Sequence, residues 1–160
     1  MTASLAIVAL ALALHAAGAE AQEARGHRSD SPSQSTRKET VGMKIRLKVG
    51  DQTVKATLLD SAAARDFAKF LPLTLTLNDL LGREKYGHLP RAISEEGQRA
   101  RSYQVGQIAY WPPASDVAVF YRDDGQSIPA PGIILLGAID SGVEALAFRG
   151  SKAVTFEVAE

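Results

Sequence analysis

The chain has 160 residues, with 18 Lys and Arg residues against 18 Asp and Glu residues, and it contains no cysteine. This length suits a single domain with one core. A balanced charge without a basic stripe argues against a nucleic-acid partner and against binding to an anionic membrane surface. The absence of cysteine excludes disulfide bonds, thiolate metal sites and a cysteine nucleophile, so the apolar core alone has to stabilise the fold.

The first 21 residues are typical of a cleavable signal peptide. Residues 5–14 (LAIVALALAL) form an apolar run that is too short to cross a bilayer and long enough for the central region of a signal. Residues 17–19 (AGA) and 19–21 (AEA) both have the small-x-small pattern that signal peptidase cleaves. We expect cleavage after Ala21, export to the periplasm or out of the cell, and no stable membrane anchor after cleavage. A buried structural helix over residues 5–14 is the alternative.

Residues 22–42 predict a disordered linker, because they are rich in Ser, Arg and Glu and contain almost nothing to bury. The folded domain is therefore expected at residues 43–160. Its first two segments, residues 43–49 and 53–59, alternate apolar and polar residues around a Gly-Asp turn and predict a β-hairpin.

A short helix and a third strand are expected next. Residues 62–70 (AAARDFAKF) contain helix formers and follow an Asp-Ser pair that can cap a helix. Residues 73–77 (LTLTL) alternate strictly, which is typical of a strand. Residues 82–101 are polar and irregular, and they predict either a long loop or a short helical excursion.

The rest of the domain is expected to be mostly β. Further strands are predicted at residues 107–111, 117–122, 133–136 and 154–158. Many short strands with one helix and Gly or Pro between them favour a closed barrel or a sandwich. Closure also removes the exposed strand edges that promote aggregation.

Three stretches carry a resemblance to a known family. They are residues 64–94 (ARDFAKFLPLTLTLNDLLGREKYGHLPRAIS), 106–123 (GQIAYWPPASDVAVFYRD) and 135–146 (LLGAIDSGVEAL). Together with the opening hairpin they resemble a largely uncharacterised bacterial family of cyclophilin-like fold proteins. The resemblance implies a small closed eight-stranded β-barrel with one or two short helices, one of which packs across an open end.

True cyclophilins isomerise Xaa-Pro bonds with an arginine beside an apolar pocket. Their Phe-Met-x-Gln-Gly-Gly-Asp pattern is absent here, since the chain has only two methionines and no Gly-Gly pair. A shared fold does not carry a shared site, so the missing pattern argues against isomerase activity.

The densest aromatic cluster lies at residues 110–122. Tyr110 and the outward-facing member of the pair Phe120 and Tyr121 would share a strand face. With Trp111 at a strand end, they would wall a groove for a ligand, and Arg122 would supply a polar contact. The alternative is that these aromatic residues fill the barrel interior.

The second candidate is the segment from Tyr86 to Arg91. His88 could act as a general base or contact a ligand, and the alternative is a surface or loop-packing role. It is the only histidine after residue 27, so a histidine-rich metal site is excluded. No G-x-S-x-G elbow or phosphate-binding loop is present, and we assign no catalytic residue, metal or cofactor. The candidate ligand-binding residues are Tyr86, His88, Arg91, Tyr110, Trp111, Tyr121 and Arg122.

The sequence favours an exported, non-catalytic or weakly catalytic module that binds a small molecule or an extended peptide. The alternative function is a divergent peptidyl-prolyl cis-trans isomerase that assists exported proteins, with Arg91 or Arg122 as the arginine near the proline. A structural accessory of a larger complex is a third possibility, which an outer apolar patch would indicate.

Overall fold

The computed structural model describes residues 42–160, so the predicted signal peptide and the predicted linker up to residue 41 lie outside the described residues. The strands are β1 (Lys44–Val49), β2 (Gln52–Leu58), β3 (Leu73–Leu80), β4 (Glu84–His88), β5 (Arg99–Ala100), β6 (Gln107–Trp111), β7 (Asp116–Phe120), β8 (Ile133–Ser141) and β9 (Lys152–Val158). The helices are α1 (Ala62–Ala68) and the two 3₁₀ turns η1 (Pro112–Ala114) and η2 (Val143–Leu146). No helix within residues 42–160 is long and apolar enough to cross a membrane.

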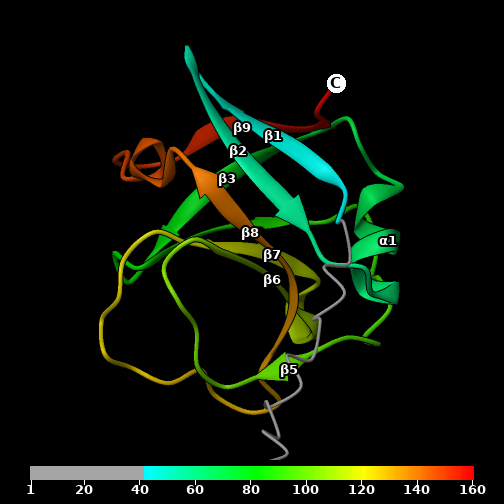
Figure 1. Ribbon diagram of the computed structural model, residues 1–160. Helices are drawn as coiled ribbons and strands as arrows, with labels where there is room; N and C mark the ends of the chain where they lie inside the picture. Colours follow the sequence, from blue (N-terminus) through cyan, green and yellow to red (C-terminus); the bar gives the residue numbers. More distant parts are fainter. Residues whose placement is uncertain (1–41) are drawn as a thin grey trace, which may run out of the picture. The chain divides into compact units, whose positions relative to one another are not determined.

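Eight of the strands close into an antiparallel barrel in the order β2-β1-β9-β3-β4-β7-β6-β8, and β8 pairs back onto β2 (Figure 1). The short β5 pairs with the first residues of β8, Ile133 and Ile134. This architecture confirms the predicted mostly β, closed eight-stranded barrel with one or two short helices, and the structure has a single short α-helix. Strand closure is tight at Gly137, where a Cβ atom would lie 2.4 Å from the Thr57 carbonyl oxygen. Only glycine therefore lets β8 approach β2 this closely.

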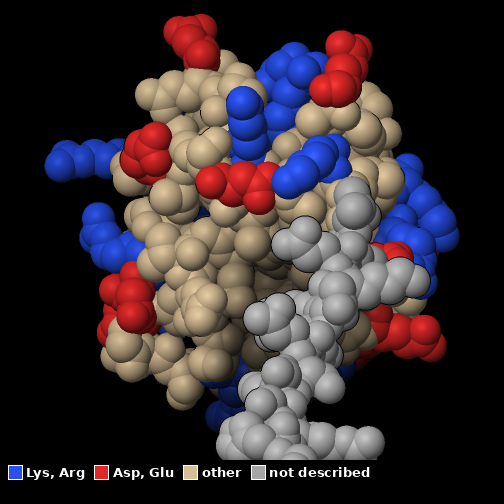
Figure 2. All heavy atoms as spheres, viewed as in Figure 1, with Lys and Arg blue, Asp and Glu red and all other residues tan. Residues whose placement is uncertain are grey.

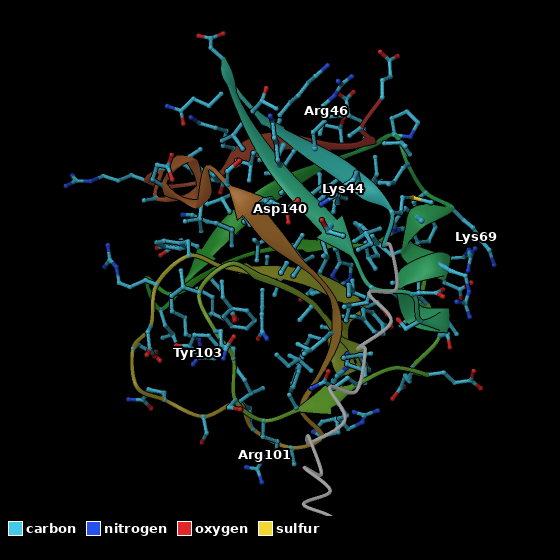
Figure 3. The ribbon with its side chains drawn as sticks, in the orientation of Figure 1. Lys44, Arg46, Lys69, Arg101, Tyr103 and Asp140 are labelled. Atoms are coloured by element: carbon cyan, nitrogen blue, oxygen red, sulfur yellow. The ribbon has the colours of Figure 1, made fainter. Side chains whose placement is uncertain are left out.

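Side-chain contacts cross the closing strands on the outer face. Lys44 on β1 and Thr57 on β2 both donate to the carboxylate of Asp140 on β8, at 3.1 Å and 2.8 Å for Oδ2. Figure 3 shows Lys44 and Asp140 meeting over β2. Lys and Arg side chains are interspersed with Asp and Glu side chains over the upper part of this face and along its margins (Figure 2). No single-sign patch is visible on it, as the neutral composition leads one to expect.

The predicted hairpin and helix are confirmed, and both supply the interior core. In β1, Ile45, Leu47 and Val49 point inward and are buried, and the turn to β2 is made at Gly50 (φ 61°). The helix α1 begins after Ser61, whose Oγ accepts a hydrogen bond from the Ala64 N–H. It inserts Phe67 against Phe156 of β9, edge to face at 5.7 Å between ring centroids. The apolar stripe of α1 thus covers one end of the barrel.

The structure corrects the prediction of an irregular segment over residues 82–101, because β4 lies within it. The chain reverses after β3 at Leu81 and Gly82, which both have positive φ (56° and 67°), and the Arg83 N–H donates to the Leu80 carbonyl at 3.1 Å. Two consecutive positive φ angles closed by this hydrogen bond correspond to a type I′ turn over residues 80–83, within the three-residue connection between β3 and β4. Three successive charged residues, Arg83–Lys85, are buried there.

A second apolar layer lies outside the barrel and positions the candidate site. β7 is buried along its whole length, so both of its faces are covered. Its inward residues Val117 and Val119 join the interior core. Its outward residues join an outer cluster with residues of β6, β8 and the segment 121–132. The buried members of this outer cluster are Ala109, Ala118, Phe120, Ile128, Ile133 and Leu135.

Candidate functional site

A pocket of about 290 Å³ opens in this outer layer, between the outer faces of β4 and β7 and the chain that leads into β8. Its lining residues are Leu80, Arg83, Glu84, Tyr86, Trp111, Asp116, Ala118, Ile128, Pro129 and Ile133. Aromatic and aliphatic side chains form most of the wall, and three charged side chains converge on it. Ligand sites commonly combine an apolar wall with a few polar groups in this way.

Strand register explains why these residues meet. β4 and β7 pair Glu84 with Phe120, Tyr86 with Ala118, and His88 with Asp116. Residues two apart in a strand share a face, so Glu84 and Tyr86 point outward while Lys85 points into the barrel. The small side chain of Ala118 leaves the space over the middle of the pair.

Arg83 lies at one end of the pocket with a side chain that is only 8% exposed. Its Nη1 is 3.5 Å from Asp124 Oδ2, and its Nε is 3.7 Å from Glu84 Oε2. Among residues 42–160, Nε has no hydrogen-bond partner. Tyr103 completes this end, because its hydroxyl donates to Asp124 Oδ1 at 2.6 Å and its ring stacks on Phe120.

These contacts fix Asp124 and the loop that carries Tyr103. The hydrogen bond from Tyr103, followed by weaker contributions that include the Arg83 charge, lowers the pKa of Asp124 below its ordinary value. The Arg83 guanidinium also lies over the Tyr103 ring, 5.6 Å from its centroid. Figure 3 shows Tyr103 among the loops beside the barrel, away from the Lys44–Asp140 contact.

Glu84 is the most perturbed carboxyl group of the pocket. Its side chain is 9% exposed, and its carboxylate makes no hydrogen bond to another residue of the described chain. Burial raises the pKa of Glu84 above its ordinary value of 4.5, the charges of Asp124 and Asp116 raise it further, and Arg83 lowers it. A buried carboxyl with a raised pKa in a cleft is a frequent mark of a functional site.

Asp116 lies at the other end, where it pairs across the sheet with both Trp111 and His88. His88 Nδ1 is 2.5 Å from Asp116 Oδ1. The His88 side chain is 73% exposed and the Asp116 side chain 13% exposed. His88 therefore sits on the rim and orients Asp116, whose second oxygen stays free of hydrogen bonds within residues 42–160.

The structure brings together some of the predicted site residues and separates others. Tyr86 and Trp111 line the pocket, and His88 borders it through Asp116. Tyr110 is 1% exposed and lies in the interior core, on the opposite face of β6 from Trp111. Arg91 is remote from the pocket, with its guanidinium over the Phe70 ring at 4.9 Å.

Tyr121 and Arg122 lie beside a different polar cluster. The Tyr121 hydroxyl donates to Asp79 Oδ1 at 2.7 Å, and Arg122 lies over the Tyr121 ring at 5.7 Å. Asp79 also accepts a hydrogen bond from Lys85 Nζ at 2.9 Å, and Lys85 donates to the Phe148 carbonyl at 2.6 Å. Burial, and then the hydrogen bond to Asp79, raises the pKa of Tyr121 to about 12.

Sequence reasoning did not select Arg83, Glu84, Asp116 or Ile128. The first two lie in the segment that was expected to be a long loop or a short helical excursion, and Ile128 comes from a Pro-rich connection that only the fold brings over β7. The period-two pattern of Glu84, Tyr86 and His88 was the available signal for their common face. Within the described part of the chain, no three His, Asp or Glu side chains are grouped to hold a metal ion.

Comparisons with known proteins agree with this fold. Residues 47–157 match the profile described as the Cyclophilin-like family. The comparison with curated proteins gives no match. Among solved structures, the chain is similar to a hypothetical protein from Archaeoglobus fulgidus, with a TM-score of 0.60 and 25% sequence identity, over 74% of this chain and 96% of that chain. The chain belongs to the Cyclophilin-like family.

Proposed function

We propose that the domain binds a small molecule in the outer pocket between β4, β7 and the start of β8. The observation that carries the proposal is the Glu84 carboxyl group, which is buried without a hydrogen bond from the described residues and faces an apolar pocket. Its 3.7 Å contact to Arg83 Nε is longer than a hydrogen bond, and a mostly buried carboxylate without hydrogen bonds costs free energy that a donor group of a ligand partly recovers.

The size of the pocket favours a small molecule over an extended peptide. A volume of about 290 Å³ is at the lower end of ligand sites and suits a body of about one ring. Ile128 and Pro129 lie over it, whereas peptide recognition commonly uses a long open groove or a free strand edge. The apolar wall takes the body of the ligand, and Glu84 at one end takes its polar group.

We also propose that this binding takes place in the periplasm or outside the cell. The support is the signal-like pattern of residues 5–21, which lies outside the described residues. Mass spectrometry of the mature protein from a secreting host tests it, because cleavage after Ala21 gives a chain that begins at Gln22.

A titration with three single-ring probes tests the binding proposal: 2-phenylethanol, 2-phenylethylamine and 3-phenylpropanoate. Trp111 is the only tryptophan of the chain and lines the pocket, so its fluorescence reports occupancy. The proposal expects at least one probe to change this fluorescence at millimolar concentration, together with amide shifts in β4 and β7. If no probe produces either change, the proposal is wrong.

A matched pair of variants locates the binding. Ala118→Val adds two methyl groups to the pocket floor and is expected to abolish the fluorescence change while the fold stays intact. Ala153→Val makes the same change on the exposed face of β9 and is expected to leave binding unchanged. Equal binding in both variants would place the ligand elsewhere.

A divergent prolyl isomerase is the second candidate function. The observation that favours it is Arg83, an arginine beside an apolar pocket, although its Nε is buried and its guanidinium pairs with Asp124. An Ala-Pro peptide followed by NMR exchange tests it. Faster cis/trans exchange that is lost in Arg83→Lys would support an isomerase, and unchanged exchange in the wild-type protein would refute it.

A further inference from the structure

We propose that the outer pocket selects an organic cation: a protonated amine on an apolar body of about one ring. The inference rests on the proposed binding function and adds the chemical class of the ligand. It follows from the kind of polar groups that the pocket leaves unused, from their charge, and from the aromatic side chains beside them.

Among the charged side chains that line the pocket, the free atoms that a ligand can reach are carboxylate oxygens, because Arg83 Nε is enclosed by protein. The Glu84 carboxylate makes no hydrogen bond within residues 42–160, and Asp116 uses one oxygen for His88. Both side chains line the pocket. A carboxylate accepts hydrogen bonds and donates none, so its preferred partner is a donor, and a charged donor binds more strongly than a neutral one.

Arg83 does not turn the pocket into an anion site. Its Nε atom is enclosed by protein, and its Nη1 is directed to Asp124 at 3.5 Å. Two carboxylates lie beside this buried guanidinium, Asp124 at 3.5 Å and Glu84 at 3.7 Å, and Asp116 supplies a third at the other end of the pocket. His88 beside Asp116 is on the exposed rim, and the other titratable neighbours, Tyr86 and Tyr103, are phenols. An incoming anion would meet the carboxylates before it reached Arg83.

Aromatic side chains complete the preference for a cation. Tyr86 and Trp111 both line the pocket, one from β4 and the other from the end of β6. A cation beside the face of Trp or Tyr gains electrostatic attraction, and the gain increases where water is excluded. Leu80, Ile128 and Ile133 supply apolar contacts for the body of the ligand.

Binding is expected to depend on pH through Glu84. Burial and the charges of Asp116 and Asp124 raise the pKa of Glu84, and Arg83 opposes them. Glu84 must be ionised to pair with a cation, so affinity rises as the pH passes upward through this pKa. An alkylamine keeps its proton up to about pH 10, so affinity stays high across the neutral range.

The test uses the full chain at pH 8 with the same three probes, which share a ring and differ in charge. The inference expects 2-phenylethylamine to bind at least about tenfold more tightly than 2-phenylethanol, as a charge-assisted hydrogen bond predicts. It expects 3-phenylpropanoate to bind most weakly. Equal affinity of amine and alcohol, or tighter binding of the carboxylate, overturns the inference while leaving the binding function standing. No binding by any probe overturns both.

Glu84→Gln tests the residue itself, because it removes the charge and keeps the shape. We expect its affinity for the amine to fall about tenfold, with little change for the alcohol. Glu144→Gln removes the same charge from an exposed position on η2 and is expected to change neither affinity. If Glu84→Gln does not fold, the comparison of the three probes on the wild-type protein still decides the question. Unchanged amine affinity in a folded Glu84→Gln variant would contradict the assignment.

Discussion

Asp79→Ala is expected to destabilise the domain much more than Lys85→Met, although the two residues form one ion pair. Lys85 is fully buried inside the barrel, and the Asp79 side chain is 35% exposed. Removal of Asp79 leaves a buried ammonium group with the Phe148 carbonyl as its remaining acceptor among residues 42–160 and also removes the partner of the Tyr121 hydroxyl. Removal of Lys85 leaves a carboxylate that water can reach.

The magnitudes follow from this difference in burial. Breaking a buried ion pair by removing one partner costs about 3–5 kcal/mol. Because water reaches Asp79, we expect Asp79→Ala to cost about 3 kcal/mol, at the lower end of this range. Lys85→Met fills the same space with an apolar chain, and Asp79 keeps its hydrogen bonds from Tyr121 and the Gly82 N–H, so we expect a loss of about 1 kcal/mol.

Urea unfolding with a common m value measures both losses in free energy of unfolding. The expected difference of about 2 kcal/mol corresponds to about 8 °C in melting temperature for a domain of this size. If Lys85→Met costs as much as Asp79→Ala, the argument that burial of the lysine decides the effect is wrong.

Four further predictions concern the turn, the closure and the titrating groups. Leu81→Asn places Asn-Gly in the type I′ turn and is expected to stabilise the domain by about 0.5–1 kcal/mol in urea unfolding, because Leu81 now holds φ at 56°; a loss of stability would contradict this. Gly137→Ala is expected to cost at least about 2 kcal/mol in the same assay, since its Cβ would meet the Thr57 carbonyl, and a neutral effect would contradict tight closure. The folded state raises the pKa of Tyr121 from its ordinary 10.0 to about 12, so the contribution of the protonated hydroxyl to the free energy of unfolding is complete below pH 10 and is lost as the pH rises to about 12. Tyr121→Phe should remove that part of the alkaline loss of stability. Carbon-13 NMR of the Glu84 carboxyl should give a pKa above 4.5, and a value at or below 4.5 would contradict its burial.

The sequence predicts the parts of the fold whose pattern is local. Period-two alternation predicts the β1–β2 hairpin, and an Asp-Ser cap before Ala-rich residues predicts α1. β4 could not be predicted in this way, because Arg83, Glu84 and Lys85 are three consecutive charged residues that tertiary contacts bury. Its turn also has Leu81 where a sequence signal would have Asn or Gly.

The candidate site was predictable only in part for the same reason. Trp111 and Tyr110 are neighbours in sequence, and strand geometry sends one to the pocket and the other to the interior. Glu84 and Asp116 line the same pocket because β4 and β7 are paired. Predicting this pairing from the sequence depends on recognising β4. Ile128 reaches the pocket from a loop whose path no local pattern specifies.

The most direct test of the pocket is an intermolecular NOE experiment on the methyl-labelled full chain with saturating 2-phenylethylamine. We expect NOEs from the ring protons to the methyl groups of Ala118, Ile128 and Ile133, which line the pocket. NOEs to methyl groups of the barrel interior or of the β1–β2 face, in place of these three, would contradict it.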